Sequence, residues 1–191
     1  MARVSERTMQ DRMRADGWTW ADVARVWSEV KGRTAADWNA GKALEHLVIR
    51  AFALSGLRVE YPYEVAFEGG VLEQVDGMVY LGDVPFLIEC KDRSTVDIEV
   101  VAKLRSRLER RPPATMGCVF TSGEFTEPVV VLANFAVPHR ITLWSRENIA
   151  EGVAQRDFAA ILRRKYHELC MFGLTDHAGG KRHLKERRNG G

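Results

Sequence analysis

The sequence predicts an α/β fold in which a mixed sheet is flanked by helices. Hydrophobic residues repeat with a helical period in residues 41–55 and again in residues 96–111. Three apolar, strand-like runs lie between these two segments, at residues 57–65, 71–81 and 84–90. A meander of strands followed by strands that alternate with helices favours a mixed sheet with helices on both faces.

Composition limits the classes of protein to consider. A chain of 191 residues, 46% hydrophobic and 28% charged, can hold one sizeable core with appendages but hardly two full domains. A net charge of +2 provides no overall basic field, so a nucleic-acid-binding surface must come from local charge. The cysteines, Cys90, Cys118 and Cys170, form no CxxC pair and indicate reduced thiols. With no secretory signal and no apolar run near the roughly 20 residues of a membrane span, we expect a cytoplasmic protein.

Residues 1–38 are expected to form a helical N-terminal extension, which carries four of the five tryptophans. Thr19 is expected to cap a helix that starts at Trp20, and Gly32 is expected to end that helix. A second short helix is expected at residues 34–38. Two helices in succession suggest a DNA-reading helix-turn-helix. The segment is short and has no clear pattern, however, so packing against the main domain or a dimer contact accounts for it better.

The main domain is expected at residues 39–145. Its first helix, residues 41–55, should end at Gly56, and Gly82-Asp83 should turn the second strand into the third. The remaining elements are a helix at residues 96–111 that Pro112-Pro113 ends, strands at residues 115–121 and 139–144, and a helix between them at residues 126–135. Residues 146–175 are expected to add a C-terminal helix at about residues 149–171, and residues 176–191 a flexible basic tail.

Two opposite charges end the strand that should be the most buried. Glu89 and Lys91 project from the same face of an extended strand, beside Leu87 and opposite Ile88. If the preceding strand pairs with this one as a hairpin, Asp76 joins them. Two hard oxygen ligands beside a cation are what a magnesium-dependent phosphodiesterase requires. An exposed Glu89–Lys91 ion pair is the alternative, but burial of both carboxylates without a cation would be costly.

This pattern resembles the PD-(D/E)xK nuclease superfamily. The resemblance rests on the order αβββαβ, with Glu45 in the first helix, Asp76 in the second strand and Glu89-Cys90-Lys91 at the end of the third. Residues 40–144 are most similar to the catalytic domain of Mrr-type restriction endonucleases. In that group a Gly-x-Phe-Thr segment follows the next strand, as Gly123-Glu124-Phe125-Thr126 does here.

The resemblance implies Mg²⁺-dependent hydrolysis of phosphodiester bonds in double-stranded DNA, in restriction or other defence against foreign DNA. Asp76, Glu89 and the backbone carbonyl of Cys90 would hold the ion, for which Mn²⁺ can substitute. Lys91 would orient the attacking water and stabilise the transition state. Glu45 would contact the ion through water or bind a second ion, and its alternative role is that of a solvated helix glutamate.

Two residues depart from the family pattern. Val75 replaces the proline before Asp76, and Glu89 stands where Mrr-type proteins often carry glutamine, which points to a sister branch with different substrates. Two alternatives remain: a structure-selective nuclease such as a junction resolvase, and a non-catalytic DNA-binding or assembly protein. The presence of Lys91 counts against the second alternative, because a decayed site would usually have lost a ligand.

Several polar residues near the motif are candidates for contacts to the DNA backbone. Gln74 shares the face of Asp76, while Arg93 and Ser94 leave the motif strand beside the expected cut. A basic row on the helix at residues 96–111 comprises Lys103, Arg107, Arg110 and Arg111. For each of these the alternative is a solvated polar side chain.

Cleavage of both strands would need a homodimer or two sequential nicks, because one domain carries one site. The interface would come from the N-terminal tryptophans or from an apolar stripe on the last helix, formed by Phe158, Ile161, Leu162, Tyr166 and Leu169. A partner protein that supplies recognition or belongs to a defence system is also consistent with the sequence, whereas a membrane partner is not expected.

Overall fold

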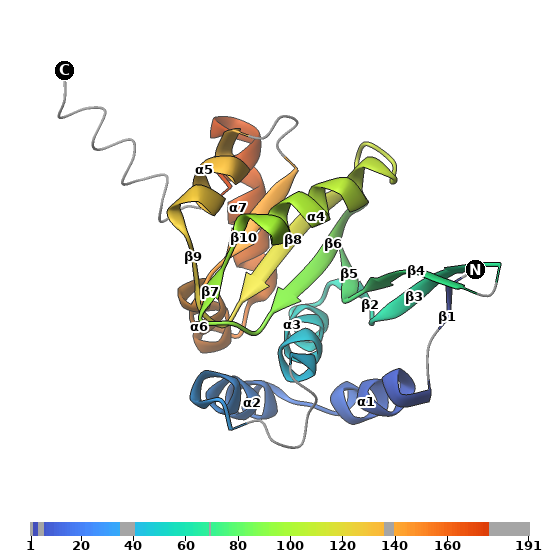
Figure 1. Cartoon of the computed structure of the whole chain (residues 1–191). Coiled ribbons are helices and arrows are strands. Elements are labelled where there is room, and N and C mark those ends of the chain that lie inside the picture. Colours follow the sequence, from blue (N-terminus) through green and yellow to red (C-terminus); the bar gives the residue numbers. More distant parts are fainter. Residues whose placement is uncertain (1, 4–5, 35–40, 69, 136–139, 176–191) are drawn as a thin grey trace.

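A five-stranded mixed sheet forms the centre of the protein (Figure 1). The computed structural model describes residues 2–3, 6–34, 41–68, 70–135 and 140–175. From edge to edge the strands are β10 (Ile141–Trp144), β8 (Met116–Thr121), β6 (Val84–Lys91), β5 (Gly77–Leu81) and β2 (Arg58–Glu60). β10, β8 and β6 run parallel, and β5 and β2 are antiparallel to their neighbours. The predicted mixed sheet is confirmed, and the strand that carries the charged motif is its central strand.

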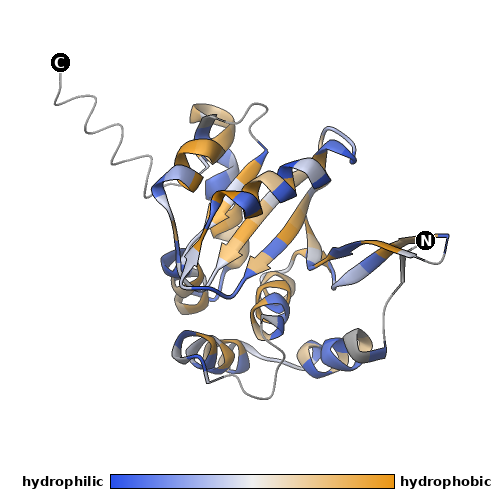
Figure 2. Ribbon diagram, viewed as in Figure 1, coloured by the Kyte–Doolittle hydropathy of each residue, from blue (hydrophilic) through white to orange (hydrophobic). Residues whose placement is uncertain are grey.

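Helices cover both faces of this sheet (Figure 1). One face packs against α3 (Lys42–Leu54), α6 (Arg146–Gln155) and α7 (Phe158–Phe172), and the other against α4 (Ile98–Glu109) and α5 (Glu127–Phe135). α2 (Trp20–Gly32) packs on α3 and α6. The strands of the central sheet are largely hydrophobic, and the helices carry hydrophilic and hydrophobic residues side by side (Figure 2). At the centre of the first face the ring of Phe52 lies edge-on to Phe120, Trp144 and Phe158, with centroids 5.9, 5.7 and 5.5 Å away. Burial of these large rings provides much of the driving force for folding.

The N-terminal helices pack against the main domain, as predicted. α1 (Glu6–Asp16) and α2 both contact α3. Thr19 caps α2 through a capping box with Asp22, and α2 ends at Gly32. Trp18 and Trp27 are 6% and 3% exposed, so they belong to the core. The short helix expected at residues 34–38 lies almost entirely outside the described residues.

The first two predicted strands are each divided between two sheets, so both predictions were wrong in extent. Residues 57–65 contain β2 and β3 (Tyr63–Phe67), and residues 71–81 contain β4 (Gly70–Val75) and β5. β3 pairs with β4 on one side and with β1 (Ala2–Arg3), where a helix was expected, on the other, in a separate three-stranded sheet. Asp76 therefore lies at a junction between strands.

Gly77 explains the break at Asp76. Its φ is +156°, and a Cβ at this position would lie 2.3 Å from Cδ1 of Ile49. α3 thus packs so closely against the start of β5 that only glycine fits there. Apolar residues lie on both sides of the junction, which is why residues 71–81 predicted a single strand.

The C-terminal segment forms two helices instead of the one predicted. Arg156 adopts a left-handed conformation with φ 55°, which ends α6, and the side chain of Asp157 caps α7. The apolar stripe proposed as a dimer interface is mostly core: the buried members are Phe158, Ile161, Leu162 and Leu169. That stripe is therefore unavailable to a second copy.

The chain between β6 and α5 holds two more short strands. β7 (Thr95–Val96) pairs in parallel with β9 (Glu124–Phe125), so α4 begins two residues after the predicted start. The predicted tail at residues 176–191 lies outside the described residues. Among the helices in the described part of the chain, none is long and apolar enough to span a bilayer.

Candidate active site

The structure brings Asp76, Glu89 and Lys91 together at the end of the β5–β6 pair. Gly77 lies opposite Ile88, which places Asp76 beside the end of β6. The Oδ2 atom of Asp76 accepts a hydrogen bond of 2.8 Å from the backbone N–H of Cys90. The Oε1 atom of Glu89 lies 2.6 Å from Nζ of Lys91. The hairpin predicted from the sequence therefore produces the predicted cluster.

Three carboxylates are buried in this region. Asp76 and Glu45 are each 8% exposed and Glu89 is 2% exposed. Burial, followed by the charge of Glu89, raises the pKa of Asp76. Burial and the charge of Asp76 raise the pKa of Glu45 to about 7, although Nζ of Lys42 lies 2.5 Å from its Oε2 atom. The carboxylates therefore repel one another in a region of low dielectric, which favours the binding of additional positive charge.

Lys91 is partly buried and remains protonated. Burial alone would lower its pKa, but the hydrogen bond to Glu89 and the surrounding carboxylates raise the pKa above its ordinary value. A fixed ammonium group beside two carboxylates can stabilise negative charge on a bound phosphate.

The donor chemistry of this cluster fits a hard divalent cation. The carboxylates of Asp76 and Glu89 and the carbonyl group of Cys90 are oxygen donors, which Mg²⁺ prefers. Within the described residues, no set of three His, Cys, Asp or Glu side chains is arranged to enclose a metal ion. The carboxylates of Asp76 and Glu89 suit an ion such as Mg²⁺, which binds one or two carboxylates and keeps several waters.

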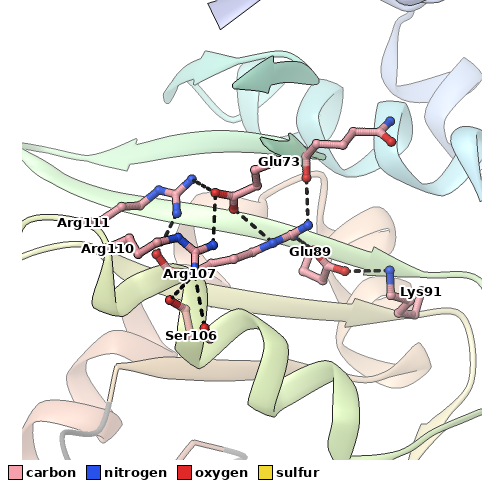
Figure 3. A network of polar contacts seen from close by, with 8 residues as sticks. Glu73, Glu89, Lys91, Ser106, Arg107, Arg110 and Arg111 are labelled. Carbon is pink, nitrogen blue, oxygen red and sulfur yellow. Dashed lines mark hydrogen bonds and ion pairs between the residues drawn. The ribbon is translucent and has the colours of Figure 1, made fainter. Parts of the chain in front are cut away.

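Arg107 and Glu73 belong to the same cluster, which the sequence analysis missed (Figure 3). Arg107 is 7% exposed, and its Nη1 atom donates a hydrogen bond to Oε2 of Glu89. Its Nη2 atom donates to the carbonyl oxygen of Gln74 at 2.9 Å, and its Nε atom lies 3.0 Å from Oε1 of Glu73. The predicted place of Arg107 on an exposed basic face was therefore wrong. A signal existed, because Arg107 lies three residues after the buried Leu104 on the inner side of α4.

The other members of the predicted basic row differ in exposure. Arg111 lies 3.1 Å from Glu73, and its side chain is only 14% exposed. The side chain of Arg110 is 58% exposed and lies 3.5 Å from Glu73. Lys103 is exposed.

A groove of about 410 Å³ runs between β4 and α4 and is lined by Leu72, Glu73, Gln74, Lys103, Ser106, Arg107 and Arg110.

The Gly-x-Phe-Thr segment supports the loop that follows the motif, where Arg93 and Ser94 are exposed. The backbone N–H of Glu124 donates to the carbonyl oxygen of Ser94 at 3.0 Å. The hydroxyl of Thr121 donates to the carbonyl oxygen of Arg93 at 3.2 Å. A Cβ on Gly123 would lie 2.0 Å from the carbonyl oxygen of Ser94, so glycine permits this close approach.

A family model and two solved structures are similar to this chain. The family model described as restriction endonuclease, of the Mrr catalytic type, matches residues 37–153. No curated protein matches the chain. The MspJI restriction endonuclease in complex with a 27-mer oligonucleotide is 20% identical, with 71% of this chain and 30% of that chain covered and a TM-score of 0.41. The DNA modification-dependent restriction endonuclease AspBHI is 17% identical, with 72% of this chain and 37% of that chain covered and a TM-score of 0.42.

The chain spans about a third of the length of these two solved structures. The family model, in contrast, covers more than half of this chain and includes the whole charged cluster. The chain therefore belongs to the Mrr-type restriction endonuclease family, with a PD-(D/E)xK-like nuclease fold.

Proposed function

We propose that this protein hydrolyses phosphodiester bonds of double-stranded DNA in a Mg²⁺-dependent reaction, in restriction or defence against foreign DNA. The observation that carries the proposal is the convergence of Asp76, Glu89 and Lys91 at the end of the central strand. Burial of like charges is costly for folding, so this cluster is better explained by function than by stability. Mn²⁺ is expected to substitute for Mg²⁺.

The proposed roles follow from the chemistry of each group. Asp76, Glu89 and the carbonyl oxygen of Cys90 would hold the ion, which would lower the pKa of a bound water and neutralise charge on the scissile phosphate. Lys91 would donate hydrogen bonds to the attacking water and to the phosphate oxygens as negative charge develops. Glu45, whose pKa is about 7, would accept a hydrogen bond from a water in the site.

We propose that the exposed polar residues around the site contact the DNA backbone. Lys103, Arg110 and Gln74 line the groove between β4 and α4, and Arg93 and Ser94 lie on the loop after β6. Phosphate contacts of this kind are independent of sequence. Arg107 and Arg111 are engaged with carboxylates of this domain, so we assign them to holding the site together.

Residues 39–145 would then form the catalytic core, with residues 1–38 and 146–175 as helical extensions that pack on it. A single site cuts one strand, so a homodimer or two successive nicks would be needed to cut both. The three cysteines are free thiols, which favours action in the reducing cytoplasm. Recognition of a particular DNA sequence would come from a partner protein.

Incubation of supercoiled plasmid with Mg²⁺, Mn²⁺ or EDTA tests the proposal. We expect metal-dependent nicking or linearisation by the native chain and none by Glu89→Ala or Lys91→Ala. Asp83→Ala, in the exposed turn between β5 and β6, is a matched control that should cut like the native chain. Absence of cutting by the native chain, with duplex binding retained by both variants, would contradict the nuclease proposal and favour a binding role. The same assay on branched and linear duplexes tests the alternative, since cutting confined to branched DNA would favour a junction resolvase.

A further inference from the structure

We propose that Arg107 is a positioning residue that fixes the carboxylate of Glu89 and that Glu73 holds Arg107 in place. The inference rests on the proposed function, because it takes Glu89 as an ion-binding carboxylate. It assigns roles to a helix residue and to a strand residue that lie outside the motif itself.

Each of the three guanidinium nitrogens of Arg107 lies close to an oxygen of the domain. Nη1 donates to Glu89, Nη2 donates to the carbonyl oxygen of Gln74, and Nε faces Glu73 (Figure 3). An arginine is suited to this position because its planar fork presents several donors in fixed directions. With these nitrogens facing oxygens of its own domain, Arg107 is better placed to orient Glu89 than to bind a DNA phosphate.

The two oxygens of Glu89 are divided between two cations. Oε2 accepts from Arg107 on α4, and Oε1 lies 2.6 Å from Lys91 on the same strand. These two contacts fix both the position and the plane of the carboxylate, which is only 2% exposed. A ligand that is oriented before it binds an ion loses less conformational entropy on binding, which strengthens the complex.

Glu73 provides the counter-charge for Arg107. It lies on β4, 3.0 Å from Nε of Arg107 and 3.1 Å from Nη2 of Arg111, and its side chain is 9% exposed. A buried arginine with Glu89 as its sole carboxylate partner would draw that group away from a bound ion. Glu73 neutralises part of the positive charge of Arg107, so Arg107 attracts Glu89 less strongly. Glu89 can then contact an ion and Arg107 at the same time. Through these contacts the strand β4 and the helix α4 are both connected to Glu89.

Arg107→Met and Arg107→Lys test this inference, with Arg105→Met as the matched control on the exposed side of the same helix. Two quantities are measured: the Mg²⁺ concentration that gives half-maximal plasmid cleavage, and the increase in melting temperature that Ca²⁺ causes without DNA. For Arg107→Met we expect the half-maximal Mg²⁺ concentration to rise by ~10-fold or more, as for other residues that orient metal ligands. Its Ca²⁺-induced increase should be smaller than that of the native chain. Arg107→Lys should recover part of both effects, and Arg105→Met should match the native chain.

Different outcomes separate this inference from the proposed function. If the native chain cuts with Mg²⁺ and is stabilised by Ca²⁺, but both Arg107 variants keep the native Mg²⁺ dependence and Ca²⁺ response, the positioning role is overturned alone. If the native chain shows neither cleavage nor stabilisation by Ca²⁺, both proposals fall. Should Arg107→Met fail to fold, Arg107→Lys decides between these outcomes. Lysine keeps the buried positive charge but lacks the planar guanidinium group with its several donors.

Discussion

The Asp76 carboxylate and the backbone N–H of Cys90 form a 2.8 Å hydrogen bond that joins the β4–β5 junction to the central strand. The bond holds Asp76 beside Glu89, at a place where both carboxylates are buried. Lys91 and Arg107 offset the charge of Glu89, whereas burial and the charge of Glu89 raise the pKa of Asp76, so the ionised form of Asp76 is costly to the fold. A conflict between stability and function of this kind is common at active sites and can be measured.

Asp76→Asn should stabilise the protein while it abolishes cleavage. Asparagine removes the charge and keeps an oxygen that can accept from Cys90. Because burial and Glu89 raise the pKa of Asp76, the ionised carboxylate is unfavourable in the fold. We expect the free energy of unfolding in EDTA to rise by ~1 kcal/mol, measured by urea denaturation. Asp83→Asn, in an exposed turn, should change neither property. Lower stability of Asp76→Asn would contradict the repulsion described above.

Gly77→Ala should distort the junction next to Asp76. A methyl group there would lie 2.3 Å from Cδ1 of Ile49 and 3.0 Å from the carbonyl oxygen of Glu60. We expect destabilisation of ~1–3 kcal/mol and a loss of cleavage, since the strain moves Asp76. Gly17→Ala is the control, because a Cβ at that position meets nothing within 4 Å. Normal activity of Gly77→Ala would show that the placement of Asp76 does not depend on the close contact with α3.

Phe52→Ala should cost more stability than most other single truncations in the protein. Phe52 is fully buried and contacts three aromatic rings from two strands and α7. We expect a loss of ~3–5 kcal/mol, measured by chemical denaturation. Phe67→Ala, at a position 63% exposed, should change stability by less than ~0.5 kcal/mol. Similar losses for the two variants would mean that the aromatic cluster does not dominate the core.

His46 should make stability fall as the solution becomes acidic. Burial lowers its pKa from 6.5 to about 4, and the side chain is 1% exposed. Between these values the unfolded chain binds a proton that the folded chain does not. The free energy of unfolding should therefore drop by about 3 kcal/mol from pH 7 to pH 4 and level off below pH 4. In His46→Gln this part of the pH dependence should disappear. If the free energy of unfolding still falls equally with pH, other groups cause the decrease.

The sequence predicted the elements whose pattern is long and regular. The helix α3 and the strand β6 were found within one or two residues, because their apolar residues repeat without interruption. The division at Asp76 was missed, because apolar residues lie on both sides of it and the close contact of Gly77 is with Ile49, far away in the sequence. The break at Arg156 was missed for a similar reason, since a non-glycine residue takes the left-handed conformation there.

For the candidate site, the hairpin geometry alone was enough to bring Asp76, Glu89 and Lys91 together. Arg107 was assigned to the DNA surface because it was counted in a basic row opposite the apolar stripe of its helix. Its burial depends on Glu73, which lies on a strand of another sheet and 34 residues earlier in the chain. Tertiary pairs of opposite charge have no periodic signal in a sequence, so only the structure identifies them.

The central claim is that Asp76 and Glu89 bind the divalent ion on which cleavage depends. Calorimetric titration of Mn²⁺ into the native chain, Asp76→Asn and Glu89→Gln in the absence of DNA tests it most directly, with Asp83→Asn as the control. The account predicts that the native chain and the control bind Mn²⁺ equally and that each site variant binds it at least ~10-fold more weakly. Equal affinity in all four proteins would contradict the account, because the ion would then bind elsewhere.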